Sequence, residues 1–259
     1  MASTASLEGV KKAVFFPFKG EKWGIKMLIG SALGLAGYMI PIIPSIPLLG
    51  YFGQMMKRII NEDEDPKLPE WTDWGNLFTD GLKLFGVSAL YSLPALLMVI
   101  AGYALMFVPY FSMMMSVTTT SYYSAPDLDP ALFAGSMFGM FGGMALIMVG
   151  FLLMLVTAVF LPPALGNMIA KNDFGAAFRI KEWWPVFKAN LGGYILALAL
   201  LFGLYWLLLM IVYVLYFTVV FCFLLPFAMA GIMYLLSAMS FSLYAVAYRD
   251  GVQKLAGVE

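Results

Sequence analysis

The densest group of side chains that could do chemistry is acidic. Asp63, Glu64, Asp65 and Glu70 lie close together in the chain, and carboxylate oxygens are ligands that hard divalent cations prefer. Their spacing lacks the regularity of a calcium-binding loop. A solvated turn is the alternative interpretation, and we favour it over a metal site.

The rest of the chain contains few of the residue types that enzymes commonly use for catalysis. The 259 residues contain no histidine and a single cysteine, Cys222. Histidine-based catalysis and a multi-cysteine metal site are therefore excluded. A membrane enzyme would instead require a cytoplasmic pocket that joins Glu70, Asp73 and Tyr51 or similar polar groups. We expect a protein that is not an enzyme and that holds no cofactor.

Four methionines lie in a stripe at helical spacing within the apolar run of residues 131–161. Three more lie just after the end of the preceding apolar run, residues 82–111. Thioether sulfurs bind the soft cuprous ion, but methionine also fills irregular gaps between helices. We favour packing. The residues are Met137, Met140, Met144 and Met148, with Met113, Met114 and Met115.

Glycines form a second stripe in the same segment. Glycines four residues apart allow two helix backbones to approach closely, as in helix pairs within membranes. The expected helix-packing positions are Gly135, Gly139, Gly143 and Gly150, with Gly30 and Gly34 in an earlier segment.

The composition of the chain indicates a membrane protein. Hydrophobic residues make up 62% of the chain and charged residues 12%, far from the balance of a soluble domain. A helix needs roughly 20 apolar residues to cross the hydrocarbon. The sequence predicts an all-α membrane protein, one transmembrane domain over residues 1–259, with about six helices. The apolar runs are residues 23–40, 42–56, 82–111, 131–161 and 191–248, the last counted as two spans.

The first two runs meet at Pro41, Pro44 and Pro47. Proline removes a helix hydrogen bond and clashes with the preceding turn, so we expect a proline-broken helical hairpin. Each arm is near the lower length limit for crossing, so a re-entrant loop is the alternative to two full spans.

Basic residues predict the orientation. They occur in four clusters near the ends of the apolar runs, whereas residues 117–130 contain none. Because positive residues favour the cytoplasmic side, we expect both termini in the cytoplasm and a non-cytoplasmic loop over residues 117–130. A formal net charge of zero argues against a nucleic-acid partner.

A short pattern occurs twice, at residues 73–78 (DWGNLF) and 173–178 (DFGAAF). Aspartate caps helix N-termini, and aromatic residues anchor helices at the membrane interface. The second copy precedes a candidate interfacial helix around Trp183 and Trp184. The pattern favours a parallel internal repeat of residues 42–116 and 131–215, although chance also produces matches this short. The shared positions are Asp73, Trp74 and Phe78, and Asp173, Phe174 and Phe178.

The stretches around the first copy resemble a known family. They are Gly50-Tyr51, Lys57-Arg58, residues 61–65, Leu68-Pro69-Glu70-Trp71 and residues 80–83; Phe16-Pro17-Phe18 and residues 173–178 add to the likeness. Together they resemble the domain of unknown function (DUF) 4013 family of prokaryotic membrane proteins. The resemblance implies a multipass protein of the prokaryotic cytoplasmic (inner) membrane. It brings no activity and no functional residue with it.

The features that favour packing outnumber those that favour chemistry. We therefore expect a non-enzymatic scaffold or accessory subunit that self-associates, or binds other membrane proteins, through its glycine faces, with membrane lipids around it. The alternative is a transporter, channel or lipid-handling protein with its pathway between the two repeats. Coupled transport is disfavoured because we expect no buried charges in the apolar helices.

Overall fold

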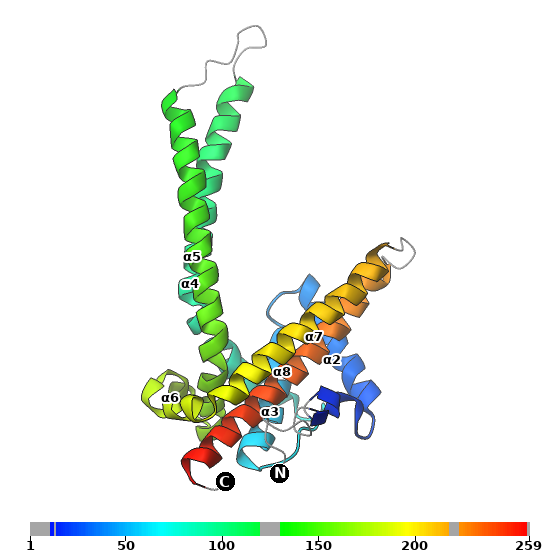
Figure 1. Cartoon of the computed structure of the whole chain (residues 1–259). Helices are drawn as coiled ribbons and strands as arrows, with labels where there is room; N and C mark the ends of the chain where they lie inside the picture. Colours follow the sequence, from blue (N-terminus) through cyan, green and yellow to red (C-terminus); the bar gives the residue numbers. More distant parts are fainter. Residues whose placement is uncertain (1–10, 13, 120–129, 218–222, 258–259) are drawn as a thin grey trace. The chain divides into compact units, whose positions relative to one another are not determined.

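A computed structural model describes residues 11, 12, 14–119, 130–217 and 223–257. Within these ranges the regular structure is entirely helical, and Figure 1 shows the arrangement of the helices. The elements are η1 (Phe16–Phe18), α2 (Trp23–Met39), α3 (Ser45–Asn61), α4 (Trp74–Thr119), α5 (Pro130–Lys171), η2 (Phe174–Phe178), α6 (Ile180–Ala189), α7 (Leu191–Phe217) and α8 (Leu225–Leu255).

Four helices are long and apolar enough to cross a membrane. They are α4, α5, α7 and α8, so the chain has the helices of a membrane protein. Helices α2 and α3, of 17 residues each, are not among them, and the count of six spans is not confirmed. Each would be about 26 Å long at 1.5 Å per residue, short of the roughly 30 Å of hydrocarbon.

The proline-broken hairpin is present. Helix α2 ends at Met39, and the chain turns through residues 40–44 with Ile42 in the left-handed region at φ 80°. Pro41 and Pro44 lie in this turn, whereas Pro47 lies in the first turn of α3. Proline is tolerated there because the first amide groups of a helix have no intrahelical partner.

The chain divides into two compact units. The first contains residues 1–87 and 162–259, and the second contains residues 88–161. The division falls inside α4 and α5, away from the limits of the expected repeats, and that repeat stays a prediction. Of the expected loop 117–130, residues 120–129 lie outside the described part of the chain.

Helix α8 is the central element of the first unit, where it contacts α2, α3, α6 and α7. Small residues on its buried face, such as Ala238, Ser242 and Ala245, allow close neighbours. Tyr234 packs over Gly30 of α2, and Tyr248 packs over Gly166 of α5. Half of the most apolar stretch of α8 is buried, which makes α8 the core helix of this unit.

The second unit is a helical hairpin formed by the adjacent parts of α4 and α5 (Figure 1). Its backbones meet at glycines. A methyl group added at Gly102 would lie 2.6 Å from the Gly143 carbonyl oxygen, and one at Gly139 would lie 2.6 Å from the Leu105 carbonyl oxygen. A methyl group added at Gly150 would lie 2.5 Å from the Val99 side chain and 3.1 Å from the Ala95 carbonyl oxygen, while Gly135 has no neighbour within 4 Å. Three of the four glycines of the stripe therefore lie against α4.

These contacts predict a difference between Gly143→Ala and Gly135→Ala. The new methyl group at residue 143 would press on the Gly102 carbonyl and the Met106 side chain, whereas the one at residue 135 meets open space. We expect Gly143→Ala to destabilise the hairpin by about 1–3 kcal/mol, the usual cost of overpacking. Gly135→Ala should keep or raise its stability, because alanine favours the helix and meets no clash there.

Thermal unfolding in detergent and hydrogen exchange over residues 88–161 measure this difference. Equal stability of the two variants would contradict the close glycine contacts.

Candidate functional site

The loop between α3 and α4 is held by two side chains from other parts of the first unit. The Lys26 ammonium donates to the Leu68 carbonyl at 3.1 Å, and the Tyr51 hydroxyl donates to the Pro69 carbonyl at 3.0 Å. The Trp71 ring stacks on the Tyr51 ring at 3.9 Å between centroids, and its indole nitrogen donates to the Lys26 carbonyl. We call this arrangement the first loop anchor.

An ion pair completes the first loop anchor. Lys26 is 7% exposed, and its ammonium lies 2.5 Å from a carboxylate oxygen of Glu70. Hydrogen bonding from Lys26 holds the pKa of the Glu70 carboxyl below its ordinary value. A buried ammonium without such partners would be costly, so the loop and α2 stabilise each other.

A second loop anchor holds the segment between α5 and α6. The Asn167 amide nitrogen donates to the Ala176 carbonyl at 2.8 Å and to a Glu182 carboxylate oxygen at 3.1 Å. The Tyr248 hydroxyl of α8 donates to the Asn167 amide oxygen at 3.1 Å. Asn167 is therefore a buried hub that joins α5, α6, α8 and the loop.

Two basic side chains form ion pairs with Glu182 at the second loop anchor. The Lys171 ammonium lies 2.7 Å from its carboxylate, and the Arg179 guanidinium lies 3.3 Å away. Hydrogen bonds from Lys171, Asn167 and Arg179 lower the pKa of Glu182 to about 2. Glu182 therefore stays ionised under all ordinary conditions.

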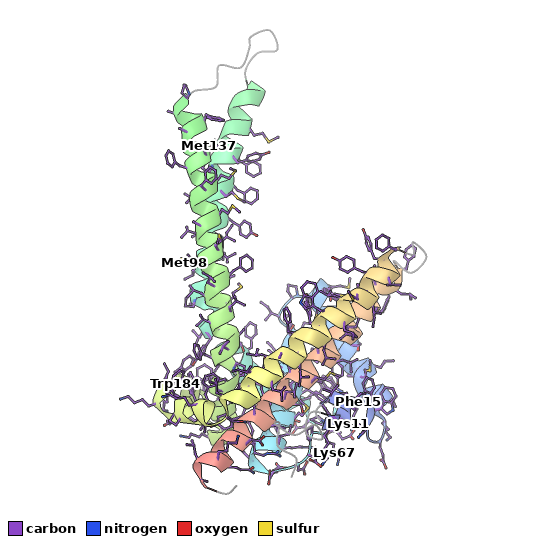
Figure 2. All side chains as sticks on the ribbon, viewed as in Figure 1. Lys11, Phe15, Lys67, Met98, Met137 and Trp184 are labelled. Atoms are coloured by element: carbon purple, nitrogen blue, oxygen red, sulfur yellow. The ribbon has the colours of Figure 1, made fainter. Side chains whose placement is uncertain are left out.

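The two copies of the short pattern lie at these anchors, and in both the aspartate caps a helix start. An Asp73 carboxylate oxygen accepts from the Asn76 backbone amide at 3.2 Å, and one of Asp173 accepts from the Gly175 amide at 3.0 Å. Asp173 also pairs with Arg179. The expected short helix around Trp183 and Trp184 is α6, with Trp184 labelled in Figure 2.

The two anchors share a further likeness, at the parallel sequences Pro47-Leu48-Leu49-Gly50 and Pro163-Ala164-Leu165-Gly166. Gly50 and Gly166 each precede a side chain, Tyr51 or Asn167, that donates to a carbonyl of the following loop. Both side chains also lie against a tyrosine of α8: the Tyr51 ring is 6.3 Å from the Tyr234 ring, and Asn167 binds Tyr248.

The aromatic residues of the pattern are partly exposed around these anchors. Trp74 lies 5.7 Å from Trp71, and Phe174 lies 5.7 Å from Phe178, both measured between ring centroids. The Phe174 ring also packs over Gly86 of α4. Phe78 is exposed on α4.

The acidic group of the first loop is divided among different basic partners. The Asp65 carboxylate lies 2.9 Å from the Lys12 ammonium, and the Asp63 carboxylate lies 3.2 Å from the Arg249 guanidinium. Glu70 forms its ion pair with Lys26. The group is thus a set of links between the loop and three other segments of the first unit, rather than only a solvated turn.

The expectation of no buried charge in the apolar helices is wrong. Lys26 of α2 and Arg249 and Asp250 of α8 are each less than 8% exposed. Arg249 pairs with Asp63 and lies 3.4 Å from Asp250. These charges are tolerated because each lies in an ion pair near a helix end. A charge inside an otherwise apolar run, such as Lys26, was the signal that could have identified them.

The structure does not bring together the three groups considered for catalysis. Glu70 and Asp73 line a polar hollow of about 480 Å³ between α3, the loop and the start of α4, while Tyr51 is buried under the loop with its hydroxyl on Pro69. Four carboxylates and three basic side chains line the hollow, so its charge is mixed. They are Glu62, Glu70, Asp73 and Asp80, and Lys57, Arg58 and Lys83.

The methionine stripe lies on the outer face of the second unit. Met137, Met140, Met144 and Met148 are all exposed, and Figure 2 labels Met137 on α5 and Met98 on α4. Met114 and Met115 are also exposed. These side chains are available to lipid or to another protein.

Comparison with known proteins identifies the family. A family model described as "Protein of unknown function (DUF4013)" matches residues 33–217, most of the chain. The chain belongs to this family, as the resemblance around Pro69 indicated. No curated protein and no solved structure matches the chain.

The lowered pKa of Glu182 predicts that the free energy of unfolding depends on pH. Its pKa is about 2 in the folded chain, against an ordinary value of 4.5. A group whose pKa is lowered by folding stabilises the protein above its unfolded pKa. This stabilisation is therefore lost as the pH falls from 4.5 toward about 2.

Glu182→Gln should lower the melting temperature at neutral pH, and the difference from the wild type should shrink through that acidic window. Thermal unfolding in detergent at several pH values measures it. Glu64→Gln, at an exposed carboxylate outside the second loop anchor, is the control. A Glu182→Gln deficit that stayed constant with pH would contradict the prediction.

Proposed function

We propose that this member of the DUF4013 family is a non-enzymatic membrane scaffold or accessory subunit that binds another membrane protein, or a second copy of itself, through the second unit. The observation that carries the proposal is the exposed outer face of α5. Phe138, Phe141, Met144 and Phe151 are each more than half exposed there. Aromatic residues and methionine are enriched at protein interfaces.

In this proposal the glycines do not bind the partner, although the sequence suggested that they would, but pack the helices within the chain. Gly139, Gly143 and Gly150 lie against α4, and Gly30 lies against Tyr234 of α8. Their faces are occupied within the chain, so they set the shape of each unit. Partner binding falls instead to the bulky outer side chains, since methionine adapts readily to different partners.

A second candidate function is lipid handling. It is favoured by an apolar groove of about 650 Å³ between α2, α7 and α8 of the first unit. A groove of this kind also suits a scaffold that carries a structural lipid, so the two functions are compatible.

The scaffold proposal predicts that a double substitution on α5 weakens association with the partner and that a matched one on α7 does not. Protein extracted gently from its own membrane should carry a stoichiometric protein partner or form a defined homo-oligomer, measured by native mass spectrometry. Phe138→Ala/Phe141→Ala should weaken that association by about tenfold, the effect of losing more than 1 kcal/mol at an interface. Phe202→Ala/Phe217→Ala, which removes two exposed rings from α7, should leave it intact.

A wild-type monomer without a protein partner would refute the scaffold. Equal loss of the partner in both double variants would refute the assignment to the second unit.

In this proposal α2 and α3 form a hairpin that returns the chain to its starting side, and both termini lie in the cytoplasm of a prokaryote. Support comes from the charges: residues 84–170 and 189–248 contain no lysine or arginine, whereas the opposite ends of α4, α5, α7 and α8 are flanked by basic residues.

Orientation is testable with cysteines at residues 6 and 121 in a background that carries Cys222→Ala. An impermeant thiol reagent added to intact cells should label Ser121→Cys and spare Ser6→Cys, and lysis should expose the second. Labelling of both in intact cells would overturn the hairpin.

A further inference from the structure

The apolar groove of the first unit has the length and lining of a lipid-chain site. Its walls come from α2 and α8, with Ile211 of α7 closing one side. From Trp23 to Leu35, the ends of the lining on α2, the axial rise is about 18 Å. One bilayer leaflet contributes about 15 Å of hydrocarbon, so the groove matches the depth of one leaflet.

Small residues keep the groove open. A methyl group added at Gly231 of α8 would meet only the Ser31 hydroxyl at 3.7 Å and the Met27 methyl at 4.0 Å, and one added at Gly24 of α2 would meet nothing within 4 Å. The same helices touch closely nearby, where Tyr234 covers Gly30. The hollow is therefore a local separation between packed helices.

Positive charge lies at one end of the groove. Lys22 directly precedes Trp23, the first groove residue of α2, and Lys19 lies three residues before Lys22; both lysines are exposed. Among the described residues no side chain caps this helix start, so its amide groups add to the positive potential. Glu21 opposes this charge, and Lys26 is already paired with Glu70. Two lysines and the helix end leave a net attraction for an anionic group.

We infer that the groove binds one acyl chain of a membrane phospholipid whose anionic headgroup lies at Lys19, Lys22 and the N-terminus of α2. The tail lies along Met27, Leu28 and Ile232, and Trp23 lies at the level where tail and headgroup meet, as tryptophan does at membrane interfaces. This inference deepens the lipid-handling candidate, which the same groove favours, and it does not rest on the scaffold role of the second unit.

Filling the groove tests the tail site. Gly231→Leu places a side chain in the groove without a backbone clash, and Gly203→Leu makes the same change on α7, where no atom lies within 4 Å of the new Cβ. Delipidated full-length protein is titrated with phosphatidylglycerol and observed by native mass spectrometry. Wild type and Gly203→Leu should bind one lipid with the same affinity, and Gly231→Leu should bind it at least about fivefold more weakly.

Circular dichroism and gel filtration establish that the variants fold. If Gly231→Leu does not fold, Gly24→Leu fills the groove from the other helix, where the new Cβ has no atom within 4 Å. Undiminished lipid binding in a folded groove variant would overturn the tail site. A homodimer that both groove variants abolish would show that a second copy occupies the groove, and would equally overturn it.

Removing charge tests the headgroup site. Wild type should bind phosphatidylglycerol several-fold more tightly than phosphatidylcholine with the same chains. Lys19→Gln/Lys22→Gln should remove this preference and keep the weaker binding. Lys181→Gln/Lys188→Gln, with the same loss of charge at exposed lysines of α6, should retain it. Equal affinity of the wild type for both lipids would overturn the anionic site.

Discussion

Close approach of helix backbones at glycines is the constraint on which both compact units depend. In the first unit the helix start of α4 meets α3 where Gly50 faces the Leu77 carbonyl and Gly81 faces the Ile46 carbonyl, and Val186 of α6 lies against Gly251 of α8. In the second unit Gly102 and Gly143 face each other. Within lipid, where the hydrophobic effect does not drive helices together, such contacts provide dispersion attraction that a side chain would prevent.

This use of glycine inside the chain bears on function. A glycine face that is occupied by a neighbouring helix of the same chain cannot also bind a partner. In the proposed scaffold role, the surfaces left for a partner are those with bulky exposed side chains, such as the methionine and phenylalanine residues of α5. Glycines that lie open have the opposite effect: Gly24 and Gly231 line the apolar groove between α2 and α8, and neither has a neighbour closer than 3.7 Å to an added Cβ.

The polar side of the first unit follows a second rule, that a buried charge needs a partner. Lys26 and Arg249 are buried, and each takes its partner from the acidic loop between α3 and α4, Glu70 in one case and Asp63 in the other. Removing Glu70 would leave the buried Lys26 ammonium without a carboxylate partner, which is strongly destabilising. Removing Asp63 would leave Arg249 with Asp250 alone, at 3.4 Å. The loop is therefore fixed to α2 and α8 at once, and with it the polar hollow that it borders.

The sequence by itself determined the membrane class, the four long helices, the break at Pro41 and Pro44, and the capping roles of Asp73 and Asp173. These depend on local properties, namely hydrophobic length, proline geometry and side-chain hydrogen bonds within a turn. Only the tertiary structure decided which glycines meet a neighbour, since Gly143 and Gly135 have the same spacing but different surroundings. It also decided that Lys26, Arg249 and Asp250 are buried, because burial depends on segments far away in the chain that supply the ion-pair partner.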